Sequence, residues 1–277
     1  MQLYDKNAFD CSKITANNYS TSFSLGIRLF KPEYRPAIYA IYGFVRFADE
    51  IVDTFHDQNK KELLQNLRDD TFKAISNKYC SNPILHSFQM VVNEYNIDHK
   101  YIEAFLHSME MDLTFKTYNA EEIKKYIYGS AEVVGLMCLR IFYKNREEEF
   151  NQLVYPARKL GEAFQKVNFL RDIRADYIGR ERIYFPGIQF EKFTAKEKSA
   201  IEEDIAFDFS EARKGIRLLH KDVRLGVFLA YTYYLNLLKK IRKTTPEEII
   251  TKRYRVSDLT KLGLFLKAWI RSLLNTI

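Results

Sequence analysis

The sequence predicts an all-α protein with a single domain over residues 1–277, and two observations carry this prediction. Only ten glycines and six prolines occur among the 277 residues, so long stretches contain no helix breaker. Apolar residues recur at steps of three and four almost throughout, and no alternating run is long enough for a sheet. With 47% hydrophobic residues, the chain can bury a substantial core.

The expected helices follow from this spacing and from the residues that interrupt it. Each interruption carries a proline, an asparagine or a helix-capping residue, as in LFKPEYRP, CSNP, TYNAEE, KNREEE, YFPGIQF and RKTTPEE. None is long enough for an interdomain linker, and no repeat of about 30 to 45 residues is present. The predicted helices cover approximately residues 33–56, 60–78, 84–95, 98–115, 120–143, 147–177, 208–242 and 257–275.

Cysteine usage and hydropathy indicate the cellular setting. Cys11, Cys80 and Cys138 are far apart and lack metal-ligand spacing, so we expect reduced thiols in a cytoplasmic protein. The N-terminal residues have no apolar segment typical of a signal peptide. The longest uncharged run, residues 225–238, is shorter than the roughly 20 residues that span a bilayer. The protein is expected to be soluble, or peripheral to the inner face of the membrane.

The formal net charge of +7 fits nucleic acid, anionic lipid or a polyanionic small substrate. Basic residues are intermixed with acidic ones, and no basic cluster stands beside a groove-reading motif. We therefore expect no nucleic-acid partner.

Two aspartates, Asp49 and Asp53, interrupt the apolar run YGFVRFADEIVDTFHD. Residues four apart lie on one helix face, so both carboxylates would point the same way. Two such carboxylates repel each other and resist desolvation. A divalent cation removes both penalties, and Mg²⁺ is typically held by one or two carboxylates and substrate phosphates.

A second pair, Asp172 and Asp176, repeats the spacing in FQKVNFLRDIRADYIGRERIYFP. Two such helices facing each other would form a four-carboxylate site. A di-iron site is not expected, because no histidine stands three residues after a glutamate. Guanidinium groups suit oxyanions, so acids and arginines together indicate a diphosphate site, with simple Arg–Asp salt bridging as the alternative. The arginines near the pairs are Arg46, Arg171, Arg180 and Arg182.

Five stretches, in order along nearly the whole chain, resemble the squalene/phytoene synthase family of head-to-head prenyltransferases. YSTSFSLGIRLF is similar to the family's N-terminal Ser-x-Ser-Phe segment, and YAIYGFVRFADEIVD to its first aspartate-rich motif. SMEMDL resembles the stretch before a central helix, YIYGSAEVVGLM the small-residue helix, and FQKVNFLRDIRADYIGRERIYFP the second aspartate-rich motif. The resemblance, strongest to bacterial phytoene synthases, implies the all-α isoprenoid-synthase (class I terpenoid synthase) fold around a central cavity.

The resemblance also implies roles for individual residues. Mg²⁺, which Mn²⁺ could replace, would bridge substrate diphosphates to Asp49, Asp53, Asp172 and Asp176. Tyr126 would handle a proton or stabilise a cation, and Tyr128 is the weaker candidate for that role. The residues matched to catalysis are these four aspartates, Tyr126, Arg46 and Arg171. Those matched to substrate binding are Ser20, Thr21, Ser22, Phe23, Gln165, Asn168, Arg182, Tyr234 and Arg253.

The implied reaction joins two geranylgeranyl diphosphates 1′-1 through prephytoene diphosphate to phytoene, in carotenoid biosynthesis, without NADPH. Because no dinucleotide-binding fingerprint and no additional C-terminal membrane span are present, we expect this reaction rather than reductive squalene formation. Squalene or dehydrosqualene synthesis from farnesyl diphosphate stays open, as does a weak or inactive paralogue that acts as a binding protein. The sequence predicts no oligomeric state.

An apolar, aromatic cavity would keep the carbocation from water. Two departures from the family pattern bear on the site. Arg174 and Ala175 stand where many members have a glycine and a glutamate, which puts the strength of metal binding in question. Glu132 lies in the small-residue helix and bears on chain-length selectivity.

The residues expected to line the apolar cavity are Phe23, Tyr42, Phe44, Met111, Val134, Met137 and Phe164.

Two other enzyme classes fit poorly. His56-Asp57 suggests a metal phosphohydrolase of the HD type, but no earlier histidine is present as a ligand. A head-to-tail prenyl diphosphate synthase should show Asp-Asp-x-x-Asp, and here Ala48 precedes Asp49.

The C-terminal segment VSDLTKLGLFLKAWIRSLLNTI has an apolar stripe. The stripe could lie on an anionic membrane, but a core helix is the preferred interpretation. It consists of Leu259, Leu262, Leu266, Trp269 and Leu273.

Overall fold

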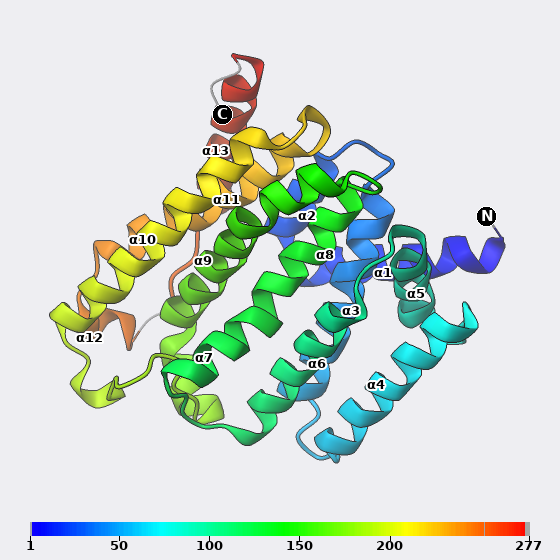
Figure 1. Cartoon of the computed structure of the whole chain (residues 1–277). Coiled ribbons are helices and arrows are strands. Elements are labelled where there is room, and N and C mark those ends of the chain that lie inside the picture. The colour runs from blue at the N-terminus through cyan, green and yellow to red at the C-terminus, as the bar shows by residue number, and fades with distance from the viewer. Residues whose placement is uncertain (1, 252, 275–277) are drawn as a thin grey trace.

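The computed structural model describes residues 2–251 and 253–274, with the side chains of Asp258 and Leu273 also outside the description. Within this part the chain is helical and contains no strand, only an isolated bridge between Thr117 and Ile183. The all-α prediction is confirmed (Figure 1). The helices are α1 (Leu3–Tyr19), α2 (Thr21–Arg28), α3 (Arg35–Asp53), α4 (Lys60–Asn77), α5 (Pro83–Tyr95), α6 (His99–Thr114), α7 (Ala120–Ile127), the π-helix η1 (Tyr128–Glu132), α8 (Val133–Phe142), α9 (Glu147–Arg180), the 3₁₀ turn η2 (Phe190–Lys192), α10 (Ala195–Leu218), α11 (Lys221–Arg242), α12 (Pro246–Ile249) and α13 (Asp258–Leu273).

Helix boundaries follow local capping signals. Asn82 caps α5, whose first residue is proline, and its side chain accepts hydrogen bonds from two backbone N–H groups of the first turn. Asn119 caps the start of α7 and Thr194 caps the start of α10, each in a capping box with a glutamate three residues later. These caps satisfy N–H groups that the helix itself leaves unpaired.

The sequence-based boundaries were wrong in several places. The predicted helices began at residue 33 and so missed α1 and α2, and the first half of α10 and the short helix α12 were also missed. The predicted helix 208–242 is two helices, because the chain becomes extended at Leu219 and His220. No glycine or proline marks this break. Instead, the backbone N–H of His220 donates to the Tyr143 hydroxyl over 3.2 Å, which is a tertiary contact. Residue 275 of the predicted last helix lies outside the described residues.

The predicted helix 120–143 is continuous but widens into the π-helix η1 at its centre. A Cβ atom at Gly129 would lie 2.2 Å from the carbonyl oxygen of Ala104 in α6, so only glycine allows this close approach. Widened turns of this kind often occur at functional sites. Here η1 directs Ser130 and Ala131 toward a cavity.

Two large hydrophobic cores flank that cavity. One includes α3, α5, α6 and α8, and the other includes α9, α10 and α11. In Figure 1, α10 and α4 lie at opposite edges of the molecule, with α8 and α9 between them. The cavity is therefore lined from both cores.

The C-terminal helix differs from its prediction as a core helix. Leu259, Leu262, Leu266 and Trp269 are all exposed on α13, and the side chain of Leu273 lies outside the description. The opposite face of α13 packs against α11. No helix in the described ranges is both long and apolar enough to cross a bilayer.

Candidate active site at the mouth of an apolar cavity

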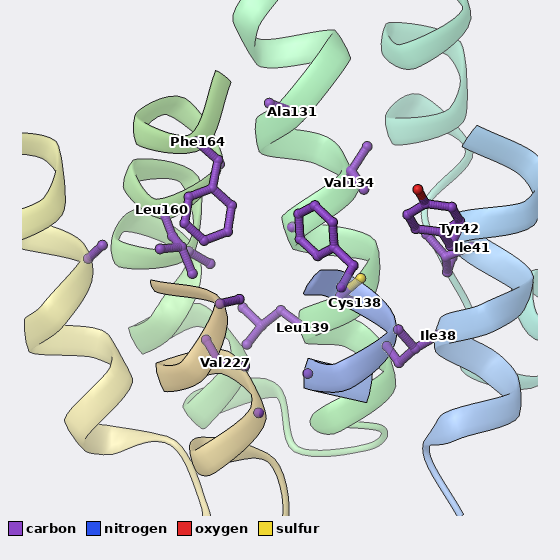
Figure 2. A pocket seen from close by; sticks show the side chains of 18 of the residues that line it. Ile38, Ile41, Tyr42, Ala131, Val134, Cys138, Leu139, Leu160, Phe164 and Val227 are labelled. Atoms are coloured by element: carbon purple, nitrogen blue, oxygen red, sulfur yellow. The ribbon is translucent and has the colours of Figure 1, made fainter. Parts of the chain in front are cut away.

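A cavity of about 380 Å³ lies between α2, α3, α8, α9, α10 and α11. Figure 2 shows side chains from α3, α8 and α9 converging on it, among them Tyr42, Val134 and Phe164. Its wall is almost entirely apolar, and polar side chains gather where Arg46, Asp49, Gln165 and Asn168 meet. The cavity thus has one polar end and a long apolar body.

The body of the cavity follows η1 and α8. Lining positions recur at helical spacing from Ser130 through Val134 and Cys138 to Phe142. At about 1.5 Å per residue, this wall is about 18 Å long. An extended hydrocarbon chain would fit along it.

The predicted lining was partly right. Phe23, Tyr42, Val134 and Phe164 line the cavity. Phe44, Met111 and Met137 do not, because each is packed in a core. Phe44, for example, is fully buried and stacks on Phe88 with ring centroids 3.9 Å apart. Helical spacing alone could not separate the cavity wall from the core, since both are apolar.

Helix α3 carries the first acidic pair. Arg46 donates to Glu50 and lies 3.7 Å from Asp49, and Arg46 and Asp49 both line the cavity. Desolvation raises the pKa of Asp49 to about 7, and the charge of Asp53 adds to the rise. A carboxylate in this position is poorly neutralised by the chain itself.

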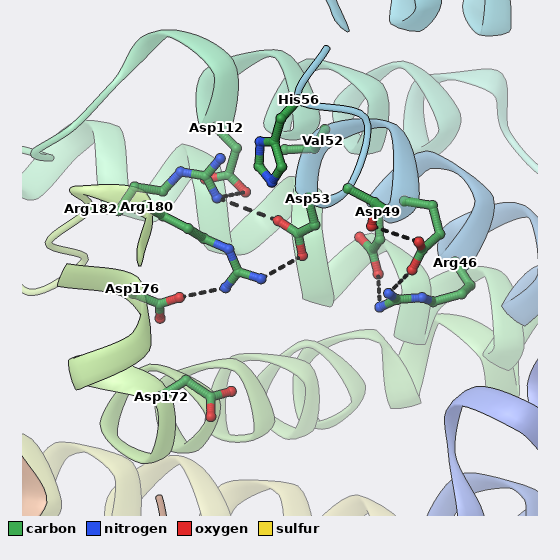
Figure 3. Close-up of polar contacts among 12 residues, drawn as sticks. Arg46, Asp49, Val52, Asp53, His56, Asp112, Asp172, Asp176, Arg180 and Arg182 are labelled. Atoms are coloured by element: carbon green, nitrogen blue, oxygen red, sulfur yellow. Dashed lines mark hydrogen bonds and ion pairs between the residues drawn. The ribbon is translucent and has the colours of Figure 1, made fainter. Parts of the chain in front are cut away.

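One arginine joins the two acidic pairs, as Figure 3 shows. Arg180 donates through Nη2 to Asp53 over 3.0 Å and through Nη1 to Asp176 over 2.7 Å. Burial raises the pKa of Asp176 to about 6 despite this hydrogen bond. Arg180 therefore links Asp53 on α3 to Asp176 on α9, the two helices that carry the acidic pairs.

Asp172 has different partners. Arg171 donates to both of its oxygens, and Arg253 Nε donates to Oδ1 over 2.7 Å. Burial alone would raise the pKa of Asp172, but hydrogen bonds from Arg171 and the charges of both arginines hold it below its ordinary value. Arg174 and Ala175, the departures from the family pattern, line a second, outer pocket of about 310 Å³ beside Asp172.

The four acids do not close a metal site by themselves. No three acidic, histidine or cysteine side chains converge on one point among the described residues. The acids supply only oxygen donors and are spread over two helices, with Asp49 lining the polar end of the cavity, which suits Mg²⁺ completed by diphosphate oxygens. Two buried polar atoms there, Arg46 Nε and Asn168 Oδ1, have no hydrogen-bond partner in the described part of the chain. This donor set fits a bound metal–diphosphate group.

The remaining polar candidates lie around the same end. Gln165 donates to the Ser130 hydroxyl over 3.2 Å, and Asn168 lies beside it on α9. Tyr234 stacks on Phe164 with ring centroids 4.0 Å apart and lines the cavity.

The N-terminal candidates lie at the start of α2. Ser20 caps this helix through the N–H of Phe23, and Thr21 accepts a hydrogen bond from Lys261. Ser22, which follows Thr21, is partly buried. Phe23 alone of the four lines the cavity.

Tyr126 lies outside the cavity lining. It is buried, and its hydroxyl donates to Asp112 Oδ2 over 2.7 Å. Asp112 also accepts hydrogen bonds from Tyr118 and Tyr184, each over 3.0 Å. Tyr128, the alternative candidate, lies under the Arg158 guanidinium.

Asp112 is the residue that sequence reasoning missed. Its Oδ2 lies 3.6 Å from Arg182, whose guanidinium lies 3.8 Å from Asp53 on the other side (Figure 3). Asp112 therefore holds Arg182 against the first acidic pair. The available signal was a lone aspartate in SMEMDL, at a position where the helix should be apolar.

Replacing Asp112 by asparagine is expected to lower the free energy of unfolding by about 3 kcal/mol, because Arg182 loses its buried counter-ion. The Mg²⁺ concentration for half-maximal turnover should rise as Arg182 shifts toward Asp53. Urea unfolding and a Mg²⁺ titration measure both effects. Glu110→Gln, at an exposed position on the same helix, is the control. Unchanged stability and Mg²⁺ dependence would contradict this positioning role.

Two other sequence features do not contribute to the site. Glu132 is buried and pairs with Arg158 over 2.5 Å, and it does not line the cavity. His56 follows the end of α3, and its Nδ1 lies 3.1 Å from Lys60 Nζ. His56 therefore marks a helix end.

Comparison with known proteins extends these observations. The family model described as squalene/phytoene synthase matches residues 16–260. Chloroplastic phytoene synthase of Narcissus pseudonarcissus is 30% identical over 97% of this chain and 67% of that protein. The 4,4'-diapophytoene synthase of Staphylococcus haemolyticus is 26% identical over 88% of this chain and 90% of that protein. A crystal structure of a dehydrosqualene synthase with ligand superposes with a TM-score of 0.84 at 23% identity, covering 99% of this chain and 98% of that one.

Proposed function

Because this chain belongs to the squalene/phytoene synthase family, prenyltransferases that condense prenyl diphosphates head to head, we propose that it converts two geranylgeranyl diphosphates to phytoene. The observation that carries the proposal is the apolar cavity, whose wall along η1 and α8 is about 18 Å long and whose polar end holds Arg46 and Asp49. A prenyl chain advances about 5 Å per five-carbon unit at ordinary bond lengths, so a 20-carbon chain needs about 20 Å. The cavity plus its polar mouth suits that length.

The chain's own residues would perform most of the first step. Arg46 and Arg182 would bind the diphosphate oxygens and stabilise the charge that develops as the allylic C–O bond breaks. When bound, Mg²⁺ would neutralise the diphosphates and be held by Asp49, Asp53, Asp172 and Asp176. The rings of Phe23, Phe164 and Tyr234 would exclude water and attract the positive charge of the allylic cation.

Carbon–carbon bond formation would then proceed without a reductant. C1 of the cation adds to the double bond of the second substrate, a proton leaves, and a cyclopropylcarbinyl diphosphate results. Loss of the second diphosphate, rearrangement and loss of a second proton give the hydrocarbon. Two substrates thus yield one phytoene, two diphosphates and two protons, with no role for NADPH.

The test incubates the purified protein with 15-carbon and 20-carbon prenyl diphosphates, with Mg²⁺, Mn²⁺ or EDTA, and with or without NADPH. We expect a 40-carbon hydrocarbon by mass spectrometry and two diphosphates released per product, in the absence of NADPH and not in EDTA. A 30-carbon product alone would identify a dehydrosqualene or squalene synthase, distinguished by the NADPH requirement. No diphosphate release from a folded protein would favour the binding-protein alternative.

A further inference from the structure

Helix α13 presents its apolar stripe to solvent. Leu259 is 84% exposed, Leu262 57%, and Leu266 and Trp269 48% each. These positions follow steps of three and four, so they form one face of the helix. The opposite face, with Leu264, Phe265 and Ala268, packs into the core around α11. An outward apolar face that includes a tryptophan is unusual for a surface helix, because the apolar stripe normally faces the core.

The positive charge of the protein is concentrated in the same region. Residues 239–277 contain ten lysines and arginines and three acidic residues, so this segment carries the whole formal net charge of +7. Residues 1–238 contain 33 basic and 33 acidic residues and are neutral overall. The basic residues are thus intermixed with acidic ones along the chain, but they are in excess only in the C-terminal segment. Exposed members include Lys239, Lys240, Arg242, Lys243, Arg255 and Lys267.

This region is also continuous with the candidate active site. Arg253, just before α13, donates to Asp172, and Lys261 in the first turn of α13 donates to Thr21 over 3.1 Å. The Tyr233 hydroxyl of α11 donates to the Lys261 carbonyl and fixes the start of the helix. Thus α13 begins beside the rim of the site.

We propose that the outward face of α13 docks on a bilayer that contains anionic lipids. The apolar stripe would enter the headgroup boundary, and the basic segment would be attracted to the anionic surface. Such docking would place the rim of the site near amphiphilic prenyl diphosphates and let a water-insoluble hydrocarbon leave into lipid. That last benefit rests on the proposed function, whereas the docking itself does not.

Charge favours a lipid surface over a second copy of this chain. A symmetric dimer through α13 would bring two segments of charge +7 together, and like charges across an interface oppose association. An anionic membrane has the complementary sign. The experiment nevertheless includes the oligomeric state as an outcome.

The chain contains a single tryptophan, Trp269, so its fluorescence reports on α13 alone. The protein is titrated with phosphatidylcholine vesicles and with vesicles that also contain phosphatidylglycerol. We expect a blue shift of the emission and quenching by brominated lipids with the anionic vesicles, together with co-sedimentation that weakens as salt is raised. No shift with either vesicle would overturn the proposal.

A matched pair of variants locates the contact. Leu259→Glu/Leu262→Glu should weaken vesicle binding at least about tenfold, because two apolar side chains leave the stripe. Leu3→Glu/Ile14→Glu changes residues that are 83% and 57% exposed on α1, nearly the same exposures, and should bind normally. Equal losses in the two variants would overturn the proposal.

Two further measurements separate the alternatives. A lipid-free wild type that is dimeric by light scattering, with a monomeric Leu259→Glu/Leu262→Glu variant, would overturn the proposal in favour of a second copy. Vesicle binding that depends on the stripe, in a protein that releases no diphosphate from prenyl substrates, would support docking while removing the proposed function.

Discussion

Asp49→Asn and Asp172→Asn are each expected to lower turnover by about 10³-fold or more, while the helical fold stays intact. A loss of this size is typical when charge stabilisation of a transition state is removed. Asn keeps the shape of Asp but removes the charge needed to hold a divalent cation. Asp49 lies beside Asp53 in a position that raises its pKa to about 7, so the fold gains little from its negative charge. Stability is therefore expected to be unchanged or higher in Asp49→Asn.

Diphosphate release over a Mg²⁺ titration measures the loss, and far-ultraviolet circular dichroism checks the fold. Asp57→Asn is the matched control, because Asp57 is exposed and follows the end of α3. Near wild-type turnover by Asp49→Asn or Asp172→Asn would refute the proposed metal ligands. If Asp172→Asn does not fold, Asp172 instead serves mainly to bind Arg171 and Arg253.

The acidic pairs could be recognised in the sequence because carboxylates in an apolar helix run carry a desolvation penalty. A carboxylate such as Asp53 or Asp176 in an apolar helix run is unfavourable without a partner, and its repetition on a second helix indicates a common purpose. The partner itself could not be predicted. Arg180 joins Asp53 to Asp176 only because α3 and α9 lie in a particular arrangement. Asp112 was missed for the same reason, since its three tyrosine donors come from different parts of the chain.

The fold was predictable where boundaries depend on local chemistry and not where they depend on tertiary contacts. The start of α5 at Asn82-Pro83 is a local signal. The break at Leu219 and His220 is not, because the backbone N–H of His220 donates to Tyr143, which directly follows α8. The outward face of α13 is a further case. The apolar stripe is visible in the sequence, but the side that packs on α11 depends on the equally apolar Leu264 and Phe265.

Cys138→Trp is expected to lower turnover of a 20-carbon substrate by about 10²-fold or more and to affect a 15-carbon substrate much less. Cys138 lines the cavity eight residues beyond Ser130, which is about 12 Å along the helix. Tryptophan there would fill the deepest third of a wall that is about 18 Å long. A 20-carbon chain of about 20 Å extends about 8 Å past that depth, whereas a 15-carbon chain of about 15 Å extends only about 3 Å past it, so the loss should be larger for the longer chain.

A bulky residue in a cavity wall can also damage the fold. The expected result is therefore a loss of turnover that is larger for the 20-carbon substrate than for the 15-carbon substrate. Overpacking typically costs about 1–3 kcal/mol, and thermal unfolding of Cys138→Trp shows whether that cost is tolerated. Cys138→Ala leaves the cavity open and should keep its preference for chain length. The Mg²⁺ dependence of residual turnover should be unchanged, since Cys138 is remote from the acids along the cavity wall. Equal losses with both substrates in a stable variant would mean that the prenyl chain does not occupy the cavity along α8, and the preference for 20 carbons would then need another origin.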